Sequence, residues 1–188
     1  MKDDARFIKN EEKIIETFKQ MVLEMNFENI TVKELTERAK INRKTFYLHY
    51  STIEDLIKSI EINYCEEYIK FIDGLDIFHD YHEIIRRFYL FHIQKGEFMD
   101  KLTCDPNYEY IRNKMINKVK ESYISTSIFE DLDKHKLNIA INYMHNTTLS
   151  LYKAWVNDNK VIPFDEIVEL NYNLVINGLS GLIKANTK

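Results

Sequence analysis

Apolar residues recur at helical spacing along most of the chain. The first such pattern runs from Asn10 to Asn26 and has apolar residues at Ile14, Phe18, Met21, Val22 and Met25. Spacings of i, i+4, i+7 and i+8 are typical of an amphipathic helix. Later patterns of the same period predict helices over residues 52–73, 80–94, 106–125, 133–156 and 163–184. We find no convincing strand pattern, so we expect an all-α fold of about nine helices.

Capping residues and chain breakers mark where these helices begin and end. Thr31 opens a capping-box signature and a helix of about two turns. Asn42 is the next capping residue, and the short helix that it opens is expected to bury Phe46 and Tyr50. A second capping-box signature at 51–54 precedes a long helix. The later helices are bounded by Gly74, Gly96, Pro106 and Pro163.

Residues 31–50 have the dimensions of a helix-turn-helix, with two short helices joined by a turn at 39–42. The local charge supports this interpretation. Residues 38–50 contain no acid and four cations, at Arg38, Lys40, Arg43 and Lys44, although the whole chain has a net charge of −4. Arg43 and Lys44 begin the second helix, from which side chains usually reach base edges in the major groove. Taken alone, these two cations would be read as a solvated charged face.

The same residues form a specific motif. It consists of Ile30-Thr31-Val32-Lys33-Glu34-Leu35, Ala39-Lys40-Ile41-Asn42-Arg43-Lys44-Thr45-Phe46-Tyr47-Leu48-His49-Tyr50 and Glu54-Asp55-Leu56. Over about residues 10–60 the chain resembles the N-terminal domain of the TetR family of bacterial transcriptional regulators. The resemblance implies a helix-turn-helix DNA-binding domain at 1–52 and a helical ligand-binding and dimerisation domain at 53–188.

The resemblance also implies roles in DNA binding. Arg43 and Lys44 are expected to read base edges. Contacts with phosphates are expected from Thr31, Asn42, Thr45, Tyr47 and His49. Two positions depart from the family pattern, because Lys40 replaces a glycine often found in the turn and Ile53 replaces a frequent lysine. The first departure could add a cation, and the second puts one phosphate contact in doubt.

The last predicted helix carries two apolar faces. One face consists of Ile167, Leu170, Leu174, Gly178 and Leu182, and the adjacent face of Phe164, Val168, Tyr172, Val175, Leu179 and Ile183. A surface helix needs one apolar stripe, so two stripes indicate burial on two sides. One side belongs to the core of its own domain, and we expect the other to form a homodimer interface with the preceding helix as its neighbour. The residues expected at this interface are Leu149, Tyr152, Trp155, Leu170, Leu174, Gly178 and Leu182. A core helix buried entirely within one chain is the alternative.

Most Phe and Tyr residues lie beyond residue 60. Aromatic walls with a few polar groups are typical of small-molecule pockets. We therefore expect a pocket for a small apolar or aromatic effector, lined by Phe88, Phe91, His92, Tyr108, Tyr123, Tyr143 and His145. The alternative is that these rings simply fill the core of a helical bundle.

These features together predict a repressor that binds a palindromic DNA operator as a homodimer and is released by the effector. A single short recognition helix makes too few base contacts to find one site in a genome, so two half-sites are needed. A DNA-anchored adaptor or activator, whose C-terminal helices bind a partner protein, is the alternative.

Composition and missing motifs exclude other classes. The chain has 45% apolar residues, 4 Gly and 2 Pro, which argues against disorder and against a loop-rich β-sandwich. With no apolar signal segment, no membrane span and no C-x-x-C pattern at Cys65 or Cys104, a cytoplasmic protein with free thiols is expected. His79 and His82 have a ligand-like spacing but no second ligand set, so no metal site is expected. The absence of phosphate-loop and nucleophile motifs predicts no cofactor and no enzymatic activity.

Overall fold

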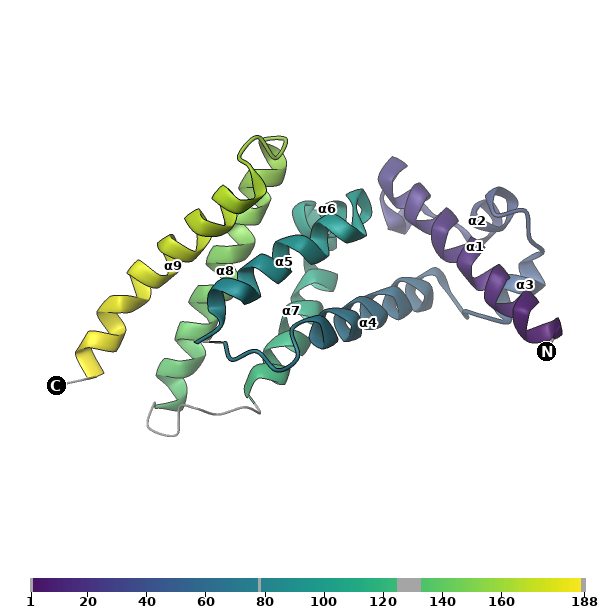
Figure 1. The fold of residues 1–188 in the computed structure, drawn as a ribbon. Helices are drawn as coiled ribbons and strands as arrows, with labels where there is room; N and C mark the ends of the chain where they lie inside the picture. The colour runs from purple at the N-terminus through teal and green to yellow at the C-terminus, as the bar shows by residue number, and fades with distance from the viewer. Residues whose placement is uncertain (1, 78, 125–132, 187–188) are drawn as a thin grey trace. The chain divides into compact units, whose positions relative to one another are not determined.

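The computed structural model describes residues 2–77, 79–124 and 133–186, with side chains at 5–77, 79–122 and 133–178. Regular structure in these ranges consists of nine α-helices and two 3₁₀-helices, which confirms the all-α class (Figure 1). The chain packs as two compact units, Met1–Glu66 and Glu67–Lys188. The division falls inside α4 (Ile53–Phe71), whereas the sequence pattern places a domain boundary just before that helix.

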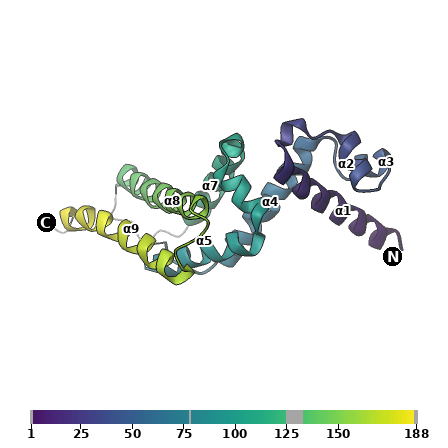
Figure 2. The ribbon, with the colours of Figure 1, turned by 90° about the horizontal axis from the view of Figure 1, so that it is seen from above.

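The first unit contains α1 (Lys2–Glu24), a 3₁₀-helix (Phe27–Asn29), α2 (Val32–Arg38), α3 (Arg43–Tyr47) and the first part of α4 (Figure 2). Helix α2 packs against both α1 and α3. The side chains that are completely buried in this unit are those of Ile14, Phe18, Met21, Val22, Leu35, Phe46 and Leu56. The apolar face predicted for α1 is therefore the face that it buries, but the helix begins well before Asn10.

The predicted helix caps are formed in the first unit. Thr31 Oγ1 accepts a hydrogen bond from the backbone N–H of Glu34 at 3.2 Å, and Asn42 Oδ1 accepts one from Lys44 at 2.9 Å. The Glu34 carboxylate pairs with Arg38 at 2.9 Å, so the structure has the Thr31 half of the capping box. The caps fix the first residue of α2 and of α3, and therefore the direction in which Arg43 and Lys44 leave the backbone.

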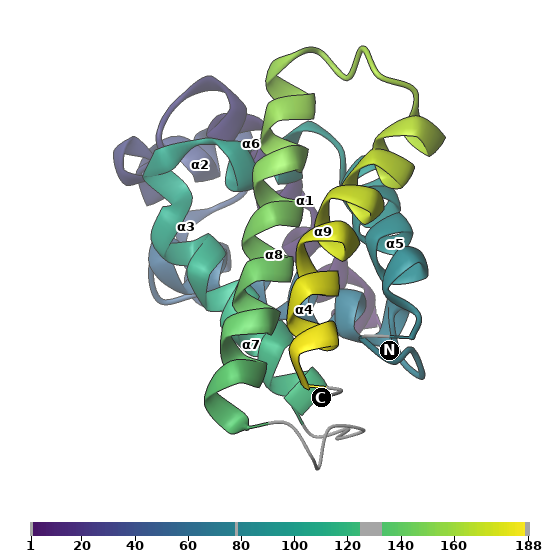
Figure 3. The same ribbon diagram turned by 90° about the vertical axis from the view of Figure 1, so that its left-hand side faces the viewer.

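The second unit contains the rest of α4, α5 (Tyr81–Lys95), α6 (Glu97–Cys104), a 3₁₀-helix (Pro106–Tyr108), α7 (Glu109–Ile124), α8 (Lys134–Asn157) and α9 (Phe164–Asn186). Helices α8 and α9 lie side by side, and α9 also packs against α5 (Figures 1 and 3). The sequence pattern did not locate α6. Gly96, with a φ of +70°, ends α5 and immediately begins α6, so one glycine separates two helices.

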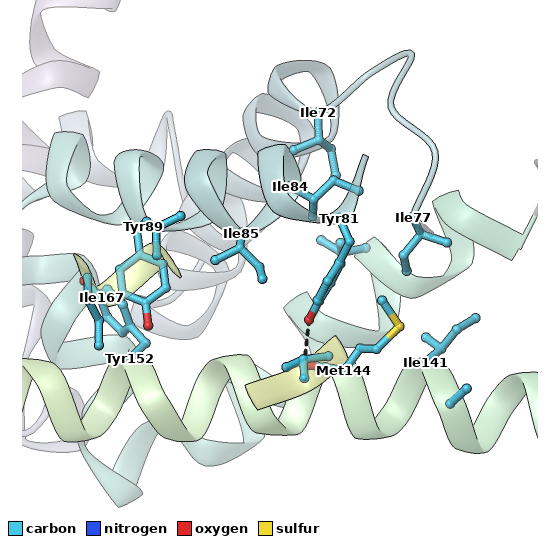
Figure 4. Packing of buried hydrophobic residues seen from close by; sticks show 14 of the residues in the cluster. Ile72, Ile77, Tyr81, Ile84, Ile85, Tyr89, Ile141, Met144, Tyr152 and Ile167 are labelled. Carbon is cyan, nitrogen blue, oxygen red and sulfur yellow. Dashed lines mark hydrogen bonds between the residues drawn. The ribbon is translucent and has the colours of Figure 1, made fainter. Parts of the chain in front are cut away.

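A chain of buried polar side chains joins α5, α8 and α9. The hydroxyl of Tyr81 donates to the backbone oxygen of Met144 at 3.1 Å and lies 2.8 Å from Thr148 Oγ1 (Figure 4). Thr148 donates to Asn171 Oδ1 at 3.2 Å, and Asn171 Nδ2 donates to the Tyr89 hydroxyl at 3.1 Å. Because each of these polar groups is buried with a partner, the chain fixes the register of the three helices.

Two histidines of the second unit, the buried His92 and the half-buried His145, carry no charge. Burial lowers the pKa of His92 to about 4, although its Nδ1 lies 2.8 Å from the backbone oxygen of Phe88. Burial also lowers the pKa of His145 to about 4, and the nearby charge of Lys120 acts in the same direction. Both imidazoles are therefore neutral at pH 7.

Candidate nucleic-acid interface

The turn between α2 and α3 is held by its own backbone. The N–H of Ile41 donates to the carbonyl of Thr36 at 3.0 Å, and Thr36 Oγ1 donates to the carbonyl of Val32 at 2.8 Å. Ala39 is buried beneath the turn. Lys40 has a φ of +53°, which is the left-handed region that favours glycine. The turn thus keeps the conformation that a glycine would adopt without strain.

We expect Lys40→Gly to raise the free energy of unfolding by about 1 kcal/mol, because the strain of a side chain at positive φ is removed. Lys40→Ala is the matched control, since it removes the same charge and keeps the strained Cβ. Urea denaturation of the two variants measures the difference. Equal stabilities would show that the turn stores no strain.

The cations in the turn and at the start of α3 are open to solvent. Lys40, Arg43 and Lys44 are exposed, and Tyr47, at the end of the helix, is 58% exposed. Arg38 differs, because its guanidinium is paired with the carboxylates of Glu24 and Glu34, and the hydrogen bond that it donates to Glu24 is the main reason that its pKa is raised. Three of the four expected cations therefore form an exposed basic patch, which we call the α3 patch: Lys40, Arg43 and Lys44.

The expected phosphate ligands are placed differently from one another. Thr31 and Asn42 are exposed but use their side-chain oxygens as helix caps, and Thr45 is half-buried. His49 packs against Phe7 of α1, with ring centroids 3.9 Å apart. Ile53 is 7% exposed, so the position that often carries a lysine contributes to the core and not to the surface.

The residues expected to line an effector pocket are placed differently from one another in the part of the chain that the structure describes. Phe88 and His145 line a cavity of about 50 Å³ together with Tyr81, Ile85 and Ile116. Tyr108 is completely buried, Tyr143 is 39% exposed, and neither lines this cavity. The remaining expected residues are Phe91 and His92, which are buried elsewhere in the core, and Tyr123, which lies outside the described side chains. The cavity has room for a few water molecules, whereas a drug-sized ligand needs about 300–1,000 Å³.

Two residues expected at the dimer interface lie inside the core of their own unit. Tyr152 is completely buried and donates to Asp100, and Trp155 is 5% exposed and donates to the backbone oxygen of Ile162 at 2.7 Å. Their i, i+3 spacing directs both rings toward α5, where they pack against Tyr89. We therefore correct this part of the interpretation and assign Tyr152 and Trp155 to the core.

The other expected interface residues lie partly on an exposed apolar surface, which we call the α8–α9 surface. It consists of Ile139, Tyr143, Leu170, Leu174 and Gly178, which are all exposed. The Tyr143 hydroxyl reaches the backbone oxygen of Leu174 at 3.5 Å and also lies where a Cβ on Gly178 would be. Because Gly178 has no side chain, the Tyr143 side chain of the same chain can occupy this space. Leu149 is half-buried beside the cavity, and Leu182 lies outside the described side chains.

The described residues contain no group of three or more side chains that could hold a metal ion. His79 Nδ1 lies 2.9 Å from Asp76, while His82 Nε2 lies 2.6 Å from Glu169 of α9, so the two histidines have separate partners. In the same part of the chain, no helix is long and apolar enough to cross a bilayer.

Comparison with known proteins identifies solved structures of similar fold but no similar curated sequence. No protein-family profile matches the chain, and no curated protein sequence matches it. The fatty acid degradation regulator FadR from Bacillus halodurans is similar in structure, with a TM-score of 0.66 and 14% identity over 90% of this chain and 96% of that one. A protein from Shewanella sp. PV-4, described as a TetR-family transcription regulator, has a TM-score of 0.65 and 13% identity over 90% and 97%. The dihydroxyacetone kinase operon activator DhaS has a TM-score of 0.57 and 16% identity over 92% and 97%. The chain therefore has the fold of TetR-family transcriptional regulators over nearly its whole length.

Proposed function

We propose that this chain is a transcriptional regulator, with no catalytic role, that binds a palindromic DNA operator as a homodimer. The observation that carries the proposal is the α3 patch, which is exposed in the turn and at the start of the capped second helix of a helix-turn-helix. The fold shared with solved transcription regulators supports the same function.

The charge and size of α3 suit the DNA major groove. Its five residues, Arg43–Tyr47, span about 7.5 Å at the helical rise per residue, and the groove is about 12 Å wide. Cations at the groove entrance attract phosphates even though the chain as a whole has a net charge of −4. Arg43 and Lys44 are the side chains proposed to read base edges, while Tyr47 and the cap residues contact the backbone.

So short a helix reads only a few base pairs, which is why two copies are needed. The α8–α9 surface supports the choice of interface, because Leu170 is 42% exposed and Leu174 is 47% exposed on one face of α9. Exposed apolar residues grouped on adjacent helices are typical of protein–protein contacts. In the proposed dimer this surface meets its own copy across a two-fold axis.

A specific observation favours a second candidate for how the regulator is controlled. The cavity lined by Phe88 and His145 is, at about 50 Å³, too small for a sizeable metabolite, so an effector bound there would have to open the packing around it. A partner protein needs no cavity, and this favours the DNA-anchored adaptor over the repressor released by a small molecule. Operator titrations with the low- and high-molecular-weight fractions of a cell extract separate the two candidates.

Substitutions in α3 test the DNA-binding function. A duplex selected by the wild-type protein from a random library serves as the operator. Arg43→Ala and Lys44→Ala should each weaken the free energy of binding to the operator by about 1–3 kcal/mol. The free energy of binding to a random duplex should weaken much less. Tyr47→Phe should weaken both duplexes by similar factors, because a lost phosphate contact carries no sequence information.

Lys134→Ala is the matched control, since Lys134 is an exposed lysine at the start of α8 in the second unit. It should leave both affinities unchanged. If Arg43→Ala weakens the random duplex as much as the operator, then Arg43 binds phosphate and does not read bases.

A further inference from the structure

Phe7 of α1 lies against His49, a residue expected to contact a DNA phosphate. The centroids of the two rings are 3.9 Å apart, and the ring planes are tilted by 32°. Phe7 is itself 44% exposed, so much of its ring remains accessible to solvent. The contact therefore lies at the surface of the first unit, beside the end of α3.

Both ring nitrogens of His49 are buried, and within the described residues neither has a hydrogen-bond partner. A buried donor or acceptor without a partner is destabilising, because its lost hydration is not replaced. Such an arrangement favours any state in which the nitrogens regain a partner. A DNA phosphate oxygen is an acceptor that an imidazole N–H can use.

A second contact attaches α1 to the same segment. Glu11 accepts a hydrogen bond from the hydroxyl of Tyr50 at 3.0 Å, and burial is the main reason that the pKa of this hydroxyl is raised to about 12. Phe7 and Glu11 share one face of α1 because they are four residues apart. The completely buried part of the helix begins with Ile14. The Phe7 ring can therefore leave His49 while the rest of α1 stays packed.

We propose that Phe7 is a positioning residue that covers His49 in the free protein and must move aside before His49 can bind a phosphate of the operator, an inference that rests on the proposed DNA-binding function. The ring contact competes with the phosphate contact for one imidazole. Phe7 thereby lowers the affinity of the first unit for DNA and couples the first turns of α1 to operator binding.

Substitution of Phe7 tests this competition. Phe7→Ala should raise the operator affinity about two- to tenfold, the range that corresponds to the loss of one ring–ring contact. The same substitution should have no effect in a His49→Ala background, where no imidazole remains to be released. Ile8→Ala is the matched control, because Ile8 is 55% exposed and belongs to the same turn of α1.

The Hε1 resonance of His49 provides a readout that a general loss of stability does not imitate. In the free protein the ring current of Phe7, whose centroid lies 3.9 Å from that of the imidazole, should shift this resonance upfield. It should move downfield when the selected operator duplex is added, and the same downfield position should be seen in free Phe7→Ala. If Phe7→Ala does not fold, Phe7→Leu, which keeps an apolar side chain but no ring, replaces it in both measurements.

An operator affinity that stays the same or falls in the folded variant would overturn the proposal, since Phe7 would then support His49 instead of covering it. An Hε1 resonance that does not move on operator binding would overturn it as well. A wild-type protein that enriches no duplex from the random library would refute the DNA-binding function and this proposal with it.

Discussion

Leu174→Lys is expected to convert the proposed homodimer into monomers and to lower operator affinity by at least about a hundredfold, since each monomer retains one recognition helix. Leu174 is 47% exposed on α9 and lies beside Tyr143 of α8. In a two-fold interface the substitution places two unpaired ammonium groups in an apolar contact. Burying such charges without partners costs about 3–5 kcal/mol, which is enough to dissociate a dimer at micromolar concentration.

Ile93→Lys is the matched control for this experiment. Ile93 is 41% exposed on α5, outside the α8–α9 surface, so the same change of residue type should leave the dimer intact. Sedimentation at micromolar concentration measures the association state, and operator titration measures the affinity. A wild-type protein that sediments as a monomer, or a Leu174→Lys protein that remains a dimer, would contradict the proposed interface.

Lowering the pH from 7 to 5 is expected to reduce the free energy of unfolding of the second unit by about 4 kcal/mol. His92 and His145 have pKa values of about 4 in the folded protein, against an ordinary value of 6.5. Between pH 4 and pH 6.5 the unfolded chain binds protons that the folded chain does not. The contribution of the neutral histidines to the free energy of unfolding is therefore complete above pH 6.5 and is lost as the pH falls toward 4. Each histidine contributes about 2 kcal/mol over this range.

The fluorescence of Trp155, the single tryptophan of the chain, reports unfolding of the unit that contains both histidines. Urea denaturation at pH 7, 6 and 5 should show His92→Gln losing about half of the pH dependence. His79→Gln is the matched control, because the His79 side chain is 69% exposed. A wild-type stability that does not change between pH 7 and 5 would show that the two imidazoles are not held neutral.

The first unit could be predicted almost completely from local sequence signals. Thr31 and Asn42 cap the helices that they were expected to cap, because a cap depends on residues within one turn. The buried face of α1 follows from the period of its apolar residues, including Ile14 and Phe18. The contact between Phe7 and His49 could not be predicted, since it joins residues far apart in the sequence and Phe7 precedes the expected start of the helix.

The second unit was harder because its last helix, α9, is apolar on two sides. Periodicity alone does not distinguish a face that packs within the chain from one that meets a partner, and Tyr152 and Trp155 were therefore placed at the interface. The buried contact of Asn171 with Tyr89 is a long-range polar pair that no local pattern signals. Likewise, the aromatic content alone does not distinguish an effector pocket from a packed core, because Phe and Tyr side chains are typical of both.

The decisive measurement is the ratio of the wild-type affinities for the selected duplex and for a random duplex at one fixed salt concentration. The account predicts an inverted repeat as the selected sequence and a ratio of about 10³ or more, because two α3 helices then read two half-sites together. A ratio near one, or a selected sequence without two-fold symmetry, would contradict a dimeric regulator that recognises its operator through Arg43 and Lys44.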